Sequence, residues 1–152
     1  MKQEKSDQSQ ELNEWHPYNL DHYAQELVVK FRDKKNVLNE SHKMRMAVAY
    51  GLERFWGEHL RFERESKQES KDKGKYWKDV WETLATKILK PTGIELPNEP
   101  VKFDQTDKIN DMTQRIWKMS PDDRTIVLMV LTQFCDSLVW WTQRYKQKGE
   151  EG

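Results

Sequence analysis

The chain has 152 residues, of which 26 are basic and 26 are acidic, and it contains a single cysteine. This length is typical of one compact domain, and the cancelling charges exclude the strong overall positive field of a free-standing nucleic-acid-binding protein. Any nucleic-acid contact must therefore come from a local basic patch. The lone cysteine, Cys135, excludes an intrachain disulfide and lies in an apolar run, which predicts an unreactive core thiol in a reducing compartment.

The N-terminal stretch MKQEKSDQSQEL contains no apolar signal segment, and no apolar run approaches the ~18 residues that span a membrane. We therefore expect a soluble, cytoplasmic protein. Residues 1–17 should form a disordered tail, because their side chains are almost all polar or charged. A single domain should follow over residues 18–147, with a disordered C-terminus at 148–152.

Apolar side chains recur at three- and four-residue spacing through most of the chain, and no segment alternates as a half-buried strand would. This pattern predicts an all-α fold class, a compact bundle of about five helices. The predicted helices cover, in chain order, residues 20–34, 41–65, 76–89, 106–119 and 121–146.

Start and stop signals place the ends of these helices. Asn19 or Asp21 should cap the first helix, and Ser41 should cap the second. The third should end at the segment Lys90-Pro91-Thr92-Gly93, because proline and glycine both interrupt a helix. The last should begin after Ser120, which precedes a proline and two aspartates.

Two further expectations concern what lies between and inside the helices. Residues 63–75 contain no apolar side chain, so the second helix should end in solvent and a flexible loop should follow it. In the fourth helix, Trp117 should be buried together with Ile116, Met112 and Ile109, which share its apolar side.

The last helix is the most apolar element, and its pattern predicts the central helix of the bundle. Met129 and Trp140 lie off its apolar face, on the polar side that carries Asp136. A tryptophan there is either half-exposed under a neighbouring helix or part of a protein contact, since tryptophan is enriched at interfaces. Of these alternatives, the contact is the one that we carry forward as a prediction for Met129 and Trp140.

The stretch 41–65 carries a basic pattern besides its apolar face. Side chains spaced seven, four and seven residues apart fall within about 20° of one line on a continuous helix: Lys43, Tyr50, Arg54 and Arg61. That line is about 27 Å long, enough to follow several phosphates of a single strand while Tyr50 stacks on a base or sugar. Gly51 lies inside the apolar face, where it should let another helix approach closely.

Three further arginines are weaker candidates for phosphate contact: Arg45, Arg64 and Arg144. The alternative is that all these side chains are ordinary solvated charges, with Arg54 and Arg61 paired to Glu58 on the same helix. Spacing alone leaves both possibilities open.

Nothing in the chain has the residue spacing of a catalytic or metal site. The histidines have no acidic or cysteine companions at zinc spacing, and there is no HExxH, no CxxC and no glycine-rich phosphate loop. Asp122 and Asp123 are better explained as residues at a helix N-terminus. An all-helical nucleotide pyrophosphohydrolase would need clustered carboxylates on facing helices to hold Mg²⁺, whereas the acidic residues here are mostly interleaved with lysines. We therefore expect a protein that is not an enzyme and needs no cofactor.

The order of elements resembles that of a known family. A tyrosine-containing first helix is followed by a helix with Gly51-Leu52, a third helix led by Tyr76-Trp77, a short helix, and an apolar last helix that ends LVWWTQRY. Over about residues 18–147 the chain is similar to the small helical subunit of type III CRISPR effector complexes, and it is closest to the Cmr kind.

The resemblance implies a non-catalytic role in RNA-guided antiviral defence. Copies of such a subunit stack along a crRNA-guided complex, between its backbone subunits and its large subunit, and line the channel that holds target RNA. Its partners would be other subunits, further copies of itself, crRNA and target RNA, with no membrane among them. Because the guide supplies sequence specificity, one basic face and some apolar patches would suffice.

Other classes of protein compete with this expectation. A helical protein-protein adaptor without nucleic-acid contact would explain Met129 and Trp140 but would leave the basic pattern without a role. A helix-turn-helix regulator would need a short, exposed recognition helix after a tight turn, which the long predicted loops do not provide.

Overall fold

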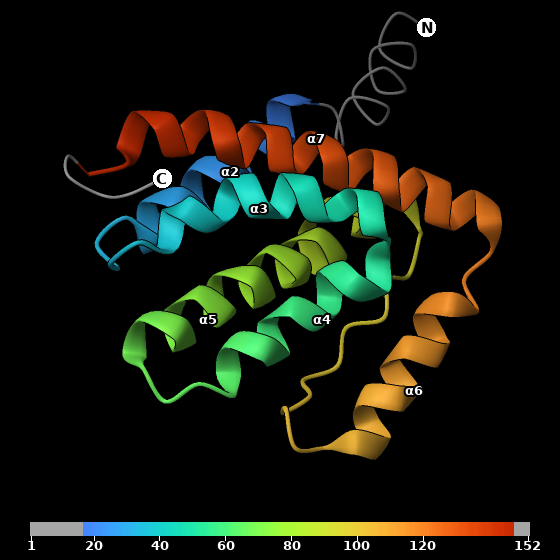
Figure 1. Cartoon of the computed structure of the whole chain (residues 1–152). Coiled ribbons are helices and arrows are strands. Elements are labelled where there is room, and N and C mark those ends of the chain that lie inside the picture. The colour runs from blue at the N-terminus through green and yellow to red at the C-terminus, as the bar shows by residue number, and fades with distance from the viewer. Residues whose placement is uncertain (1–16, 148–152) are drawn as a thin grey trace, which may run out of the picture.

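The computed structural model describes residues 17–147, and it confirms the predicted all-α fold class. Within those residues there are six α-helices and no strand. Short 3₁₀ turns lie at Val37–Asn39, Val48–Tyr50 and Lys90–Thr92, and a π-helical turn, Leu84–Ile88, continues α5. The helices, labelled in Figure 1, are α2 (Pro17–Phe31), α3 (Glu40–Ala47), α4 (Leu52–Glu63), α5 (Gln68–Thr83), α6 (Thr106–Trp117) and α7 (Pro121–Tyr145).

The predicted disordered ends, residues 1–17 and 148–152, lie outside the described residues except for Pro17, which begins α2. The last two predicted helices are confirmed to within two residues at each end. Ser120 caps α7 as expected, because its hydroxyl accepts a hydrogen bond of 3.1 Å from the backbone N–H of Asp123.

The helices form two layers around one core. α7 lies along α2 and α3 on one side, and α4 and α5 form an antiparallel hairpin on the other (Figure 1). An irregular segment of residues 93–105 runs from the 3₁₀ turn Lys90–Thr92 to α6, which contacts α4. The long connection therefore places α6 at the edge of the bundle rather than in its centre.

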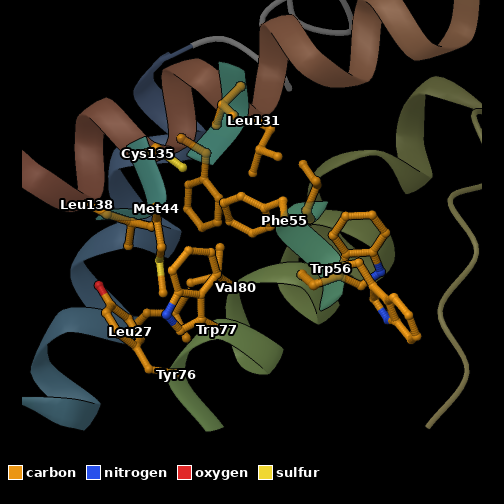
Figure 2. Packing of buried hydrophobic residues seen from close by; sticks show 14 of the residues in the cluster. Leu27, Met44, Phe55, Trp56, Tyr76, Trp77, Val80, Leu131, Cys135 and Leu138 are labelled. Atoms are coloured by element: carbon orange, nitrogen blue, oxygen red, sulfur yellow. The ribbon is translucent and has the colours of Figure 1, made fainter. Parts of the chain in front are cut away.

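Aromatic side chains fill the space between the layers. Phe55 on α4 packs with its ring centroid 4.9 Å from that of Trp77 on α5, and both are buried. α7 closes this core with Leu131, Cys135 and Leu138 (Figure 2). Cys135 is fully buried, as the sequence predicted. The prediction that α7 is the central helix was wrong, because α7 lies with α2 and α3 along one side of the core.

Among residues 17–147, α7 alone is long and apolar enough to cross a membrane. A helix that packs into the core of a soluble protein meets the same criterion, and α7 buries Val130, Leu131 and Phe134 in a core shared with α2 and α3. The feature is therefore weak evidence for a membrane span.

The prediction of one continuous helix over residues 41–65 was wrong. Gly51 has φ 102° and ψ 163°, a backbone conformation that is essentially restricted to glycine, and it separates α3 and its 3₁₀ extension from α4. Gly51 therefore turns the chain instead of admitting a neighbouring helix. The apolar periodicity carried across the break, which is why the sequence pattern suggested a single helix.

Ser41 is not an N-cap, because α3 begins one residue earlier, at Glu40. The Ser41 hydroxyl is instead buried, 2.7 Å from the Tyr76 hydroxyl and 2.7 Å from that of Thr142. These three hydroxyls join α3, α5 and α7 in the core. A serine used in this way cannot be told from a cap by sequence alone.

The expected flexible loop at residues 63–75 is mostly helix, since α5 begins at Gln68. Its first turns are polar but are linked by side-chain pairs at i,i+4, including Gln68 with Asp72 and Lys73 with Glu69. Trp117 was also predicted wrongly: it is about half exposed, because α6 turns only Met112 and Ile116 fully toward the core.

Gly74, on α5, is the glycine that allows close helix packing. A Cβ added there would lie 3.1 Å from the His59 carbonyl oxygen and 3.1 Å from the Phe62 Cβ, both on α4. A Cβ added at Gly57, in the middle of α4, would meet nothing within 4 Å.

We expect Gly74→Leu to lower the free energy of unfolding by roughly 1–3 kcal/mol, because the new side chain overpacks the α4–α5 contact. The matched change Gly57→Leu should raise stability by up to about 1 kcal/mol, because leucine favours a helix more than glycine does. Urea unfolding of both variants, followed by circular dichroism, measures the difference. Equal stability of the two variants would contradict the close packing at Gly74.

Candidate nucleic-acid interface

A hollow of about 350 Å³ lies where α3 and α4 meet Trp77 of α5, and we call it the Tyr50 hollow. Three of the four residues of the predicted basic line reach it. Its lining residues are Lys43, Met46, Ala47, Tyr50, Arg54, Glu58 and Trp77.

Tyr50 and Arg54 form the open side of this hollow. The Tyr50 side chain is 63 % exposed, and the Arg54 guanidinium lies 5.9 Å from the centre of its ring. Within residues 17–147, no carboxylate lies within ion-pair distance of Arg54. The predicted alternative, in which Glu58 neutralises Arg54, is therefore wrong for this arginine, and its charge and the tyrosine ring both face solvent.

Lys43 differs from Arg54 because it forms an ion pair. Its ammonium lies 3.2 Å from Oε2 of Glu40, whose side chain is completely buried, and Oε1 of Glu40 accepts a hydrogen bond of 3.1 Å from the Trp77 indole N–H. A buried carboxylate requires such partners. Lys43 therefore neutralises the charge of Glu40, and this ion pair competes with any contact between Lys43 and a phosphate.

Arg61 is paired with Glu58, as the alternative prediction of solvated, paired charges stated. It donates to Oε2 of Glu58 through two nitrogens, at 3.0 and 3.2 Å, and the bond to Glu58 is the main cause of its raised pKa. Its guanidinium also lies 4.2 Å from the centre of the Phe62 ring. Because the helix breaks at Gly51, the expected straight line of four side chains does not form, and Arg61 lies outside the Tyr50 hollow.

Two of the three weaker candidates are engaged elsewhere. Arg45 pairs with Asp136 on α7 at 2.6 Å, and the Arg144 guanidinium lies 3.7 Å from the centre of the Trp140 ring. Arg64, just after α4, is exposed. None of the three lines the Tyr50 hollow.

Met129 and Trp140 are each about half exposed, as their position off the apolar face of α7 predicted. Trp140 is covered by Arg144 on one side and meets Trp141 edge-on, with the ring centroids 4.7 Å apart. The contact of Met129 and Trp140 with a partner stays a prediction.

Sequence reasoning missed several residues at or beside the site, of which Met46 and Glu40 are the most informative. Met46 is 71 % exposed and lines the Tyr50 hollow, and its position three residues after Lys43 and four before Tyr50 was a usable signal. Glu40 could not have been found in this way, because nothing in the pattern distinguishes a buried glutamate from a solvated one.

Three side chains with titratable groups, Cys135, Tyr76 and His59, are buried in the core. Burial raises the pKa of the Cys135 thiol and of the Tyr76 hydroxyl far above their usual values, so both stay protonated. Burial lowers the pKa of His59, whose ring contacts the Trp56 carbonyl oxygen. Within residues 17–147, no group of three His, Cys, Asp or Glu side chains could hold a metal ion.

No known protein family, curated protein or solved structure matches this chain.

Proposed function

We propose that the protein is a non-catalytic, RNA-binding small subunit of a crRNA-guided type III CRISPR complex, and that the Tyr50 hollow faces the target-RNA channel. The resemblance of the sequence supports this proposal through the order of its helices and the Gly51-Leu52, Tyr76-Trp77 and LVWWTQRY segments. The proposed setting is cytoplasmic, with crRNA, target RNA, other subunits and further copies of the protein as partners.

The observation that carries the RNA-binding proposal is the pairing of Arg54 with Tyr50. An arginine without a carboxylate partner is available to a phosphate, and an exposed tyrosine beside it offers a face on which a base or sugar can pack. Such a contact carries no information on base identity, which suits a complex whose guide RNA reads the sequence.

A protein-protein adaptor without RNA contact is the second candidate, and the exposure of Met129 and Trp140 favours it. Exposed tryptophan and methionine are enriched at protein interfaces. The two candidates predict different results for the same arginine substitution.

In the complex assembled with guide RNA, Arg54→Ala should weaken target-RNA binding by about fivefold, equivalent to about 1 kcal/mol. It should also reduce the slope of log K against log salt by about 0.7, the value for one phosphate on a single strand. The measurement is a titration with labelled target RNA at two salt concentrations.

Arg32→Ala is the matched control, because the Arg32 guanidinium lies 5.7 Å from the Tyr145 ring in a similar pair outside the Tyr50 hollow. It should leave both the affinity and the slope unchanged. An intact complex in which Arg54→Ala also changes neither quantity would favour the adaptor.

A further inference from the structure

A second hollow, of about 550 Å³, lies where the segment before α6 passes the α4–α5 hairpin. We call it the Phe103 hollow. Its residues come from α4, α5, the segment and the start of α6: Glu63, Lys71, Lys78, Pro100, Val101, Lys102, Phe103, Asp104, Gln105 and Lys108. Its volume is within the range of about 300–1,000 Å³ typical of small-ligand sites.

The Phe103 hollow is separate from the Tyr50 hollow. Glu63 follows Arg54 by nine residues, which places it about half a turn around α4 and about 14 Å farther along the helix axis. In Figure 1 the segment between α5 and α6 runs past α4 on its way to α6. The two hollows share no lining residue and lie on opposite flanks of α4.

A defined turn presents the aromatic ring of this hollow. The backbone N–H of Lys102 donates to the Gln105 side-chain oxygen at 2.9 Å, and the backbone N–H of Gln105 donates to the Lys102 carbonyl oxygen at 3.0 Å. Phe103 lies between these residues and is 45 % exposed, whereas its neighbour Val101 is buried. The turn is therefore anchored through Val101 while the phenyl ring faces solvent.

Positive charge predominates among the residues that line this hollow. Four lysines face two carboxylates in the Phe103 hollow, an excess of two positive charges: Lys71, Lys78, Lys102 and Lys108, against Glu63 and Asp104. In the described part of the chain, none of the four ammonium groups has a carboxylate within 4.0 Å. Lysines from three separate segments thus line one hollow without ion-pair partners among the described residues.

The combination matches a nucleotide better than a peptide. A base has a flat face that stacks on an exposed aromatic ring, and its phosphates are attracted to ammonium groups nearby. An acidic peptide would use the lysines but would gain little from a single flat ring. The charge of Lys78 also reaches His59, where it adds to the effect of burial in lowering the pKa of that histidine.

We infer that the Phe103 hollow is a second binding site for single-stranded RNA, in which a base stacks on Phe103 and the flanking phosphates contact Lys71, Lys78, Lys102 and Lys108. The inference rests on the proposed function only in taking RNA as the ligand. An RNA strand that contacts both hollows would pass across α4, so the protein would bind RNA on two sides of one helix.

The test titrates the purified full-length chain into fluorescein-labelled oligouridylate at two salt concentrations. The double variant Lys102→Ala and Lys108→Ala should weaken binding and reduce the slope of log K against log salt by about 1.4, that is, about 0.7 for each phosphate contact. Phe103→Leu should weaken binding by about 5- to 100-fold with the slope unchanged, because leucine keeps the apolar contact but cannot stack.

The double variant Lys34→Ala and Lys35→Ala is the matched control, since these exposed lysines line neither hollow, and it should bind as the unsubstituted chain does. The inference is overturned if the unsubstituted chain does not bind oligouridylate, if Phe103→Leu binds normally, or if a labelled polyglutamate peptide binds equally well. Arg54→Ala in the same assay separates the two sites: its effect should add to that of Phe103→Leu. If Arg54→Ala alone has no effect, the proposed role of the Tyr50 hollow fails while the inference stands.

Discussion

Gly51→Asn should lower the free energy of unfolding by roughly 1–3 kcal/mol, because it forces a side chain into a backbone conformation that favours glycine. Gly51 has φ 102° and ψ 163°, and residues with a Cβ rarely adopt this conformation. A Cβ there would also approach the Glu53 carboxylate to 2.9 Å. The chain must therefore either hold a strained residue or straighten the corner between α3 and α4.

Gly93→Asn is the matched control, because Gly93 also has a positive φ but leaves room for a side chain. Gly93 has φ 81° and ψ −1°, close to the left-handed region that asparagine tolerates, and a Cβ there would meet nothing within 4 Å. We expect it to cost less than about 1 kcal/mol. Urea unfolding with circular dichroism compares the two variants, and equal losses would show that the conformation of Gly51 is not special.

The break at Gly51 also shows where sequence reasoning stopped. The all-α class, the stop at Lys90–Gly93 and the last two helices followed from apolar spacing, proline, glycine and the Ser120 cap, which are local signals. The corner at Gly51 is different, because α4 continues the apolar face of α3 in sequence. Only the packing of α4 against α5, on the far side of the core from α7, requires the chain to turn there.

The candidate site was predicted in part for the same reason. Tyr50 and Arg54 were identified from their spacing of four residues, which survives across the break, and they do lie together. Arg61 was grouped with them by a straight helix that does not exist, and it pairs with Glu58 instead. The Phe103 hollow had no sequence signal, because its lysines come from α5, α6 and the segment between them.

Glu40→Ala should lower the free energy of unfolding by about 2–4 kcal/mol, through a cavity and a buried indole N–H without an acceptor. Glu40 is completely buried, and its Oε1 is the hydrogen-bond acceptor of Trp77. Glu40→Gln keeps an oxygen in that place and should cost less than about 1.5 kcal/mol. Glu82→Ala, at an exposed position on α5, should change stability by no more than about 0.5 kcal/mol.

The glutamine variant also connects the core to the proposed function. The Lys43 ammonium, 3.2 Å from Oε2 of Glu40, would lose its carboxylate partner and become available beside Arg54. In the assembled complex, Glu40→Gln should therefore strengthen target-RNA binding and increase the salt slope by up to about 0.7. Urea unfolding and the two-salt titration measure the two effects.

A Glu40→Ala variant as stable as Glu82→Ala would contradict the structural role of Glu40. If Glu40→Gln left the slope unchanged, Lys43 would have no part in holding RNA.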